Sequence, residues 1–362
     1  GYDSAGIAVH DKKKINIIKS QGKISELEKK LCKNNLDGIL GIGHTRWATH
    51  GVPCDKNAHP QASVKNKIAV VHNGIIENYL ELKNELTEDD FSSDTDTEVI
   101  AHLIDKYYTE SNKLENFIDA VITVIKKLIG SYALAIICED FPNKLIAVKK
   151  DSPLVVGIGK NENFVASDIT AFVEYTREVL YLDDNEIAVL DNKKIELLDL
   201  NKNKIRKDIS KIDWDIQSSE KAGYDFFMLK EIHEQPNAIK DFLSINLSDD
   251  DFLDKINLSI DKIKNLDRIY IVGCGTAYHA GLIGAKLLER IPNIFVSAQM
   301  ASEFRYSNQI INQKSLVILI SQSGETADTL GALRISKKSG AKTLAIVNVV
   351  GSNIEIGRAS CR

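Results

Sequence analysis

The sequence predicts two domains of different fold class, an α+β domain followed by an α/β domain with a doubly wound parallel sheet. The first observation is length, because 362 residues exceed what one hydrophobic core usually holds. The second is that strand-like and helix-like segments of the first part occupy separate stretches, as in α+β proteins. The third is that short apolar strands alternate with helical patterns in the last part, as in a doubly wound sheet.

The first domain is expected at residues 1–210. Two β-rich runs, residues 5–9 and 15–20, flank a polar turn and predict a hairpin. Apolar runs at 39–42 and 68–71 predict buried strands that each lead into a polar motif. The remaining expected elements are helices at 24–31, 76–86, 97–108 and 114–128, followed by antiparallel strands at 131–138, 144–148, 154–158, 164–166 and 186–190.

A linker is expected at 211–224, where the apolar period is lost and charge rises. The second domain is expected at 225–352 and begins with two helical patterns. After these two helical patterns, strands and helices alternate, which requires parallel strands with crossover helices. The expected strands are 268–272, 293–297, 316–320 and 343–347, and the expected helices are 226–238, 253–263, one ending near 288 and one ending near 339.

Composition indicates a soluble globular enzyme and excludes several other classes of protein. Hydrophobic residues make up 43% and charged residues 27% of the chain, which is ordinary for a globular protein. The net charge of −5 gives no reason to expect a nucleic-acid or anionic-membrane partner, and no apolar run is long enough to span a bilayer. Five scattered cysteines without a C-x-x-C pair favour free thiols, so we expect a cytoplasmic protein.

Four of the eight histidines fall between positions 44 and 72, which raises the question of a metal site. The spacing of His44, His50 and His59 does not match the usual helical pairs of zinc ligands, and no carboxylate is interleaved with them. We therefore expect no metal in this region.

The polar residues of the first domain fit the recognition of a zwitterionic amino acid better. Arg46 can form a bidentate ion pair with an α-carboxylate, and Asp96 can accept hydrogen bonds from an α-ammonium. Asn73 and Gly74 offer a side-chain amide and a backbone N–H, the two donors of an oxyanion hole. An Asn-Gly pair more often forms a tight hairpin turn. Here it follows an apolar strand and is expected to lead directly into a helix, which fits a hairpin poorly.

Segments 1–9, 43–51, 57–60, 70–79 and 95–102 resemble the glutaminase domain of the glutamine–fructose-6-phosphate aminotransferase family. The resemblance implies an N-terminal-nucleophile αββα fold. It implies that Arg46 holds the glutamine carboxylate, Asp96 its α-amine, and Asn73 with the Gly74 N–H the oxyanion. Further residues matching the family are Trp47, which is implied to gate ammonia passage, and His50 and His59, which either line the pocket or are structural. Gln61 departs from the histidine that members often carry.

The family's nucleophile is a cysteine at the mature N-terminus, whose own α-amine acts as the base. The resemblance places it about two dozen residues before Gly1, so we expect the chain to lack it and to have no glutaminase activity. Cys54 is a possible substitute because His50 and His59 flank it in sequence. It lies in a proline-containing loop and has no α-amine beside it, so we do not expect it to act as the nucleophile.

A second polar motif follows the strand expected at 316–320 and precedes a helix; it reads Ser321-Gln322-Ser323-Gly324-Glu325-Thr326. Hydroxyl groups at a helix N-terminus can bind phosphate without a cationic side chain. The alternative is a simple N-cap, which needs one hydroxyl, whereas this turn supplies three. The turn at 273–278 contains glycines but lacks the third glycine of a dinucleotide fingerprint, so no cofactor is expected.

Both turns, together with residues 230–236, resemble the sugar isomerase (SIS) domain of the same family. The resemblance implies that the phosphate of fructose 6-phosphate is bound by Ser321, Gln322, Ser323 and Thr326. Thr276 is implied to contact the sugar, and Ala277 stands where some members carry serine. Family members continue through a second SIS domain, so the chain is expected to be truncated at both ends. Residues 353–362 do not match, and we expect them to be foreign or frame-shifted sequence.

The implied function is transfer of the amide nitrogen of glutamine to fructose 6-phosphate, giving glucosamine 6-phosphate and glutamate. This is the first step of amino-sugar and UDP-N-acetylglucosamine synthesis. The expected partners are glutamine, fructose 6-phosphate and a second copy of the chain, because family members are dimers. Two alternatives remain: a sensor that binds glutamine or a sugar phosphate without turnover, and another amidotransferase of the purine or asparagine pathways, which the SIS-like turns disfavour.

Overall fold

The structure is a computed structural model that describes residues 3–34, 36–47, 51–86, 91–108, 113–212, 223–246, 258–349, 352–356 and 359–361. The chain divides into two compact units, Gly1–Trp214 and Asp215–Arg362. The linker expected at 211–224 lies mostly outside the described residues, so its bounds stay a prediction.

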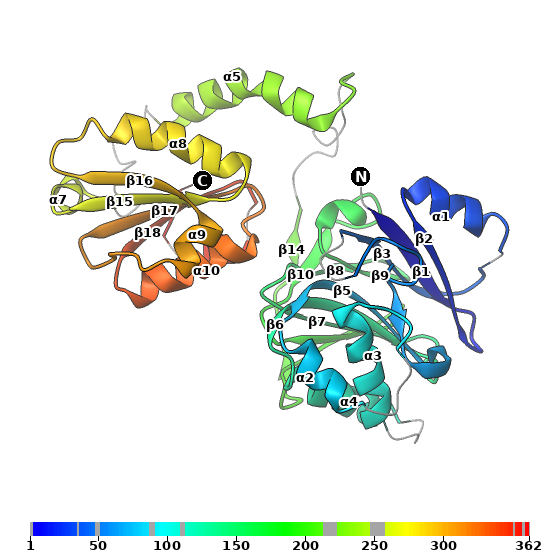
Figure 1. Ribbon diagram of the computed structural model, residues 1–362. Coiled ribbons are helices and arrows are strands. Elements are labelled where there is room, and N and C mark those ends of the chain that lie inside the picture. Colours follow the sequence, from blue (N-terminus) through cyan, green and yellow to red (C-terminus); the bar gives the residue numbers. More distant parts are fainter. Residues whose placement is uncertain are drawn as a thin grey trace. The chain divides into compact units, whose positions relative to one another are not determined.

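Unit 1 contains three antiparallel sheets (Figure 1). A three-stranded sheet has the order β2 (Ile15–Gln21), β1 (Ser4–His10), β3 (Leu40–Arg46). The large sheet has the order β13 (Lys204–Ile205), β12 (Ile195–Leu198), β11 (Ile187–Leu190), β7 (Leu145–Lys150), β6 (Gly130–Cys138), β5 (Ile68–Ile76), β4 (Gln61–Ala62). A four-stranded sheet has the order β14 (Ser210–Lys211), β10 (Glu178–Tyr181), β8 (Val155–Ile158), β9 (Asn163–Ala166).

The helices of unit 1 complete a four-layer arrangement. They are α1 (Ile24–Leu31), α2 (Tyr79–Asn84), α3 (Asp96–Tyr107) and α4 (Leu114–Ile125), with short 3-10 turns at Val64–Asn66 and Ile169–Ala171. Helices α3 and α4 cover one face of the large sheet, the two smaller sheets cover its other face, and α1 packs on the three-stranded sheet. This confirms the αββα fold implied by the resemblance.

The large sheet is buried on both faces, which explains its apolar sequence. Along β6, Leu134 and Ile136 face the helices, whereas Ala133 and Ala135 face the smaller sheets. Side chains alternate between the faces of a strand. A strand covered on both sides therefore becomes a continuous apolar run, and the smaller residues lie where a second sheet packs closely.

The prediction of a helix beginning at residue 76 was wrong, and so was the view that Asn73 and Gly74 end a strand. Strand β5 continues to Ile76, and α2 begins only at Tyr79. Gly74 pairs with Tyr132 of β6 and has a φ of 138°. A Cβ atom there would lie 2.1 Å from the carbonyl oxygen of Ser131. The glycine is thus required by the close approach of β6, not by a turn.

Unit 2 has a parallel sheet in the order β16 (Phe295–Met300), β15 (Arg268–Gly273), β17 (Ser315–Ser321), β18 (Lys342–Val347), β19 (Ala359–Cys361). Its helices are α5 (Phe227–Asn246), α7 (Ile260–Lys264), α8 (Thr276–Leu288), α9 (Ala301–Tyr306), α10 (Ala327–Lys338) and α11 (Asn353–Ile356). Helix α8 packs on one face, α9 and α10 on the other, which confirms the doubly wound fold.

Two parts of unit 2 differ from the sequence-based expectation. The helix expected at 253–263 falls partly on residues outside the description, and α7 begins at Ile260. The stretch expected to be foreign contains α11 and β19, and β19 pairs in parallel with β18. Its foreign origin stays a prediction.

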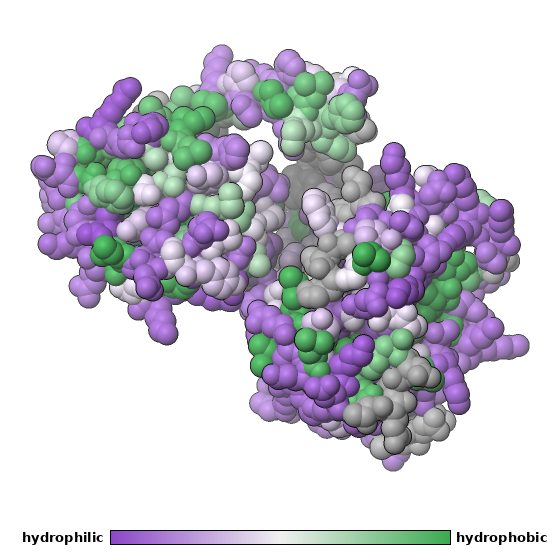
Figure 2. All heavy atoms as spheres, in the orientation of Figure 1, coloured by the Kyte–Doolittle hydropathy of each residue, from purple (hydrophilic) through white to green (hydrophobic). Residues whose placement is uncertain are grey.

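Several large apolar side chains of unit 2 are exposed, and Figure 2 shows them over α5 and α8. On these two helices and at the residue before α5, the large apolar side chains that are more than half exposed are Phe226, Phe227, Met228, Ile232, Ile239, Ile283 and Leu287. Such a patch usually marks an interaction surface. In the part of the chain that the structure describes, no helix is both long enough and apolar enough to cross a membrane.

Candidate functional site

The polar residues of unit 1 gather where β3, β5 and the first turn of α3 meet. Arg46 is the last residue of β3, Asn73 lies on β5, and Asp96 is the first residue of α3. The side chains of Arg46 and Asp96 are buried, whereas Asn73 is exposed. Among the described residues, no hydrogen bond engages the Asn73 amide, so that amide can bind a ligand.

Asp96 lies against the strand that carries Asn73. Its Oδ2 atom accepts a hydrogen bond from the backbone N–H of Ile76 at 2.9 Å. The same oxygen is 3.9 Å from Nδ1 of His72. A carboxylate at a helix N-terminus also interacts favourably with the helix dipole. The end of β5 and the start of α3 are therefore joined through this one side chain.

The buried hydroxyl of Thr97 connects three segments that are distant in sequence. It lies 2.8 Å from Nε2 of His59 and 2.9 Å from Nδ1 of His72. One hydroxyl carries one proton, so at least one of the two imidazoles must donate to it. Thr97 thereby fixes the loop before β4 and strand β5 to helix α3. No role for Thr97 was predicted from the sequence, although the residue follows Asp96 directly.

His44 and His59 form a pair of neutral rings beside Arg46. Their ring centroids are 4.7 Å apart. Burial, together with the neighbouring His72 and Arg46, lowers the pKa of His44 to about 4. Burial and the adjacent His44 lower the pKa of His59 well below its ordinary value. Both rings are uncharged at neutral pH, which leaves the guanidinium as the cation among these groups.

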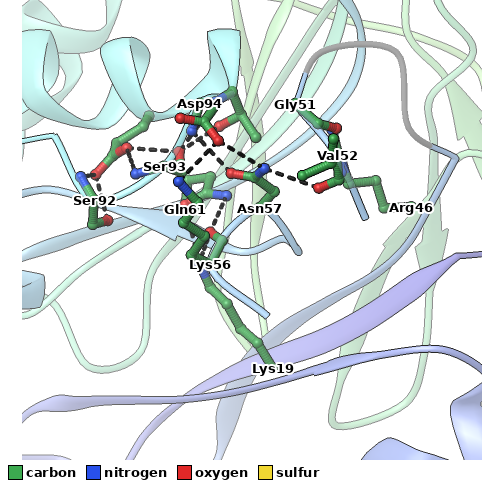
Figure 3. A network of polar contacts seen from close by, with 12 residues as sticks. Lys19, Arg46, Gly51, Val52, Lys56, Asn57, Gln61, Ser92, Ser93 and Asp94 are labelled. Carbon is green, nitrogen blue, oxygen red and sulfur yellow. Dashed lines mark hydrogen bonds and ion pairs between the residues drawn. The ribbon is translucent and has the colours of Figure 1, made fainter. Parts of the chain in front are cut away.

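The loop that follows β3 is anchored by Asn57, as Figure 3 shows. Arg46 donates from Nη2 to the carbonyl of Gly51 at 3.1 Å. The Asn57 amide donates to the carbonyl of Val52 at 2.9 Å and to Asp94 at 3.2 Å. Its oxygen accepts the backbone N–H of Asp94 at 2.9 Å. The arginine end of the site is thus tied to the loop that precedes Asp96.

Gln61 holds the same loop from its other end. The buried amide donates to the carbonyls of Ala58 at 3.0 Å and Lys56 at 3.2 Å. Its oxygen accepts from the Lys19 ammonium at 3.0 Å (Figure 3). Burial lowers the pKa of Lys19 to about 8, and the Glu98 carboxylate acts in the opposite direction. Lys19 was not found from the sequence because only the pairing of β1 with β2 brings it here.

Glu98 fixes the loop before α3. The N–H and hydroxyl groups of Ser92 and Ser93 donate to its carboxylate at 2.6 to 2.8 Å. Burial raises the pKa of Glu98, but the hydrogen bonds from His102, Ser92 and Ser93 outweigh it and lower the pKa to about 2. The ionised Glu98 carboxylate, which we call the clamp, therefore holds the loop that leads into Asp96, the first residue of α3.

Three other residues named from the sequence lie differently. Trp47 is 77% exposed just after β3. His50 lies outside the described residues. Cys54 is a half-buried free thiol in a loop, where its carbonyl accepts the backbone N–H groups of Asn57 and Ala58. Within the described residues, no three histidine, cysteine or acidic side chains are placed to hold a metal ion.

In unit 2 the two polar turns, residues 273–278 and 321–326, lie side by side at the carboxyl ends of the parallel strands β15 and β17. Strands β15 and β17 are parallel neighbours, with Gly273 opposite Ile320. Helix α8 leaves β15 toward one face, and α10 leaves β17 toward the other. This is a topological switch point, where doubly wound sheets bind their ligands. The Cys274 sulfur, 3.9 Å from the Thr329 hydroxyl, links the two sides.

The hydroxyl groups of the turn at 321–326 are oriented by the turn's own backbone. Ser321 Oγ accepts the N–H of Gly324 at 3.0 Å, and Ser323 Oγ accepts the N–H of Glu325 at 3.1 Å. A hydroxyl that accepts one bond keeps its proton to donate. Thr326 is the N-cap of α10, yet its side chain makes no capping bond. Hydroxyls and helix N–H groups therefore remain for an anion.

Gln322, in the turn after β17, and Thr276, in the turn after β15, are both exposed. Thr276 begins α8, directly after Gly275, which has a φ of 56°. Both side chains are exposed at the switch point. Their contacts with a ligand stay predictions.

Comparison with known proteins matches each unit to a family. Residues 44–174 match the glutamine amidotransferase domain and residues 262–357 the SIS domain. A glutamine–fructose-6-phosphate aminotransferase (isomerizing) of Clostridium perfringens is 51% identical over 358 residues, and that of Clostridium tetani is 50% identical. The chain is a homologue of the glutamine–fructose-6-phosphate aminotransferases. Each alignment covers 98% of the chain and 58% of the relative, so the chain spans somewhat more than half the length of these aminotransferases.

Among solved structures, the C-terminal domain of the Francisella tularensis glucosamine-fructose-6-phosphate aminotransferase is 37% identical to the chain. The match covers 39% of this chain and 40% of that chain, with a TM-score of 0.34. The amidotransferase match includes Arg46, Asn73 and Asp96, and the SIS match includes both turns of the switch point. Each candidate site thus lies inside the domain whose chemistry it fits.

Proposed function

We propose that the full-length gene product to which this chain belongs transfers the amide nitrogen of glutamine to fructose 6-phosphate, yielding glucosamine 6-phosphate and glutamate, whereas the 362-residue chain alone does not release glutamate. The observation that carries the proposal is the hydroxyl-bearing turn at the switch point of unit 2. A glutamine amidotransferase domain can supply ammonia to many acceptors. A SIS domain with a phosphate-binding turn on the same chain narrows the acceptor to a sugar phosphate. The relatives that bear this activity in their names align along 98% of the chain.

In unit 1, the proposed roles follow from charge and exposure. Arg46 binds the α-carboxylate of glutamine, and Asp96 binds its α-ammonium. Asn73 and the N–H of Gly74 stabilise the oxyanion formed when the amide is attacked. Three further residues, Trp47, His50 and His59, border the glutamine pocket. The neutral state of His44 and His59 suits this place, because a charged ring would repel the Arg46 guanidinium.

In unit 2, Ser321, Gln322, Ser323 and Thr326 bind the phosphate, and Thr276 contacts the sugar. Glutamine hydrolysis consumes one water and releases ammonia. Condensation of that ammonia with the ketone carbon of fructose 6-phosphate releases one water. The overall reaction is therefore balanced by the two substrates alone and needs no cofactor.

We further propose a cytoplasmic homodimer. The exposed apolar residues of α5 and α8 support an association surface, since patches of this kind are usually covered in the working protein.

The test is an assay of the full-length gene product with fructose 6-phosphate and glutamine labelled with nitrogen-15 at the amide. The expected result is glucosamine 6-phosphate that carries the label. An intact, folded enzyme that forms none would contradict the proposal.

The competing functions give different results in the same experiment. A sensor would bind both ligands, measured by calorimetry, and release no glutamate. An amidotransferase of another pathway would release glutamate and show no affinity for fructose 6-phosphate.

A further inference from the structure

The phosphate turn of unit 2 is supported by a segment far away in sequence, residues 352–354, which we name the supporting segment. It follows β18 and lies within the SIS match, which extends to residue 357, so we take residues 353 and 354 as part of the SIS domain although foreign sequence was expected from residue 353 onward. The backbone N–H of Ile354 donates to the carbonyl of Gly324 at 3.1 Å. The Ile354 side chain is fully buried against Leu330 and Ala345. The supporting segment is therefore fixed in the core of unit 2 and holds the turn by its backbone.

Gly324 packs tightly on this segment. Its φ is 69°, and a Cβ atom there would lie 2.1 Å from the hydroxyl oxygen of Ser352. The turn and the supporting segment are in direct contact, without room for a side chain between them.

The strongest link is made by Glu325. Its Oε1 atom accepts the backbone N–H of Asn353 at 2.7 Å, and its Oε2 atom accepts the Asn353 side-chain amide at 2.6 Å. The backbone N–H of Glu325 also donates to Ser323 Oγ. Fixing Glu325 therefore fixes the orientation of a hydroxyl that is proposed to bind phosphate.

A carboxylate in a phosphate-binding turn needs an explanation, because like charges repel. The two donors of Asn353 compensate its charge and pin it to the supporting segment. We propose that Glu325 is a positioning residue for the sugar-phosphate site and that Asn353 is the partner through which it acts. The proposal rests on the function proposed for unit 2.

Two explanations of Glu325 predict opposite effects of Glu325→Gln. If the carboxylate only repels phosphate, removing its charge tightens binding. If it positions the turn, the neutral glutamine amide loses one charge-assisted hydrogen bond to the Asn353 side chain, or regains only a weaker neutral one after the Asn353 amide turns over, and binding weakens. We expect the affinity for fructose 6-phosphate to fall about tenfold, the value of roughly one such bond. Asn353→Asp sets two carboxylates face to face, and we expect it to weaken binding further.

The double variant Glu325→Gln with Asn353→Asp restores the pairing in reverse. The glutamine oxygen accepts the backbone N–H of residue 353, and the glutamine amide donates to the new aspartate. The net charge equals that of the unchanged protein. We expect affinity within about twofold of the original, a rescue that a purely electrostatic role of either residue does not give. Glu289→Gln is the matched control, since it removes one carboxylate at the opposite end of α8.

Affinity is measured by calorimetry on the 362-residue chain with fructose 6-phosphate, and with fructose as the phosphate-free probe. Circular dichroism checks that each variant is folded. Weakening in both single variants with recovery in the double variant supports the proposal. Unchanged or tighter binding by Glu325→Gln, or no recovery in the double variant, overturns it while the proposed function stands. If the unchanged chain binds fructose no more weakly than fructose 6-phosphate, the phosphate site proposed for unit 2 fails, and the positioning role fails with it.

Discussion

The two candidate sites of this chain are built in opposite ways. In unit 1 the groups proposed to bind glutamine, Arg46, Asn73 and Asp96, come from two strands and a helix that are distant in sequence, and buried side chains hold them together. In unit 2 the groups proposed to bind phosphate come from one turn of six residues, and the backbone of that turn orients them. The first site should therefore respond to the charge and protonation of buried groups, and the second to backbone geometry.

The buried ring network of unit 1 has no counterpart among the described residues of unit 2. His44, His59 and His72 surround the Thr97 hydroxyl and Arg46. In unit 2 the hydroxyls accept N–H groups of their own turn, and the supporting segment is held by a glutamate and an asparagine. Variants at Arg46, Gly324, His44 and Ser352 should therefore affect the two units differently.

The largest effect is expected from Arg46→Ala. Removing a buried guanidinium that is proposed to pair with the substrate carboxylate should weaken glutamine binding about a thousandfold, roughly 4 kcal/mol. Calorimetry with glutamine measures the loss, and fructose 6-phosphate binding by unit 2 serves as the internal control. Arg46→Lys should recover only part of the affinity, because an ammonium does not make the two-pronged contact. Full glutamine affinity in Arg46→Ala would remove Arg46 from the site.

Gly324→Ala should destabilise unit 2 by about 2 to 4 kcal/mol. One part is the cost of a side chain at positive φ, about 1 to 2 kcal/mol, and the other is the clash with Ser352. Gly340→Ala is the matched control, because its φ is also positive, 77°, and the nearest atom to its Cβ is a flexible Gln313 carbon at 3.4 Å. Thermal unfolding measures both.

Adding Ser352→Gly to Gly324→Ala separates the two parts. It removes the clash and leaves the backbone strain, so stability should return to the level of the Gly340→Ala control. If the double variant stays as unstable as Gly324→Ala, the contact with Ser352 is not the cause.

Unit 1 should lose stability as the pH falls from about 6.5 toward 4. The folded-state pKa of His44 is about 4, below its ordinary value of 6.5, and that of His59 is lowered in the same direction. The unfolded chain then binds more protons in this interval, so protonation favours unfolding. The contribution of these two histidines is complete above about pH 6.5 and declines below it. Calorimetric unfolding at several pH values measures the decline, and unit 2 should change less.

The interval from pH 6.5 to 4.5 isolates the histidines. The clamp carboxylate of Glu98 has a lowered pKa, about 2, so its contribution is lost only as the pH falls below 4.5. Replacing His44 by glutamine should flatten the slope in this interval. A slope that His44→Gln leaves unchanged would assign the pH dependence to other groups.

The smallest effect is expected from Ser352→Ala. The Ser352 hydroxyl is buried, and no described residue bonds to it. Its removal takes away a buried polar group without a hydrogen-bond partner and should raise the free energy of unfolding by less than about 1 kcal/mol. Thr97→Val in unit 1 is the matched case, because that hydroxyl has two imidazole partners and its loss should cost about 1 to 3 kcal/mol. Equal changes in the free energy of unfolding for Ser352→Ala and Thr97→Val would contradict the view that buried side-chain hydrogen bonds hold unit 1 more than unit 2.

Much of the fold could be predicted because it follows from local patterns. The apolar runs that became β5, β15 and β17 reflect burial on both faces, and the strand–helix alternation of unit 2 required parallel strands. The extent of β5 could not be predicted. Its Asn-Gly pair looks like a strand end, and only the pairing of Gly74 with Tyr132 of β6 shows that the strand continues.

The candidate site residues were found where chemistry is local and missed where it is not. The residues of the proposed phosphate site are consecutive in the sequence, at 321–326, so the motif could be found without the structure. Thr97 is an ordinary helix residue in the sequence, and Lys19 an ordinary strand residue. Their roles arise from contacts with His59 and Gln61, which the folding of the chain brings near.

The sequence by itself determined the two fold classes, the order of the domains and the residue types available to bind an amino acid and a phosphate. Which imidazoles stay neutral, and which loops the side chains of Asn57, Gln61 and Glu98 hold, depends on the tertiary structure. It also joined Glu325 to Asn353. The physical reason is that periodicity and turn chemistry act between neighbours in the chain, whereas burial and hydrogen-bond partnership depend on residues that only folding brings together.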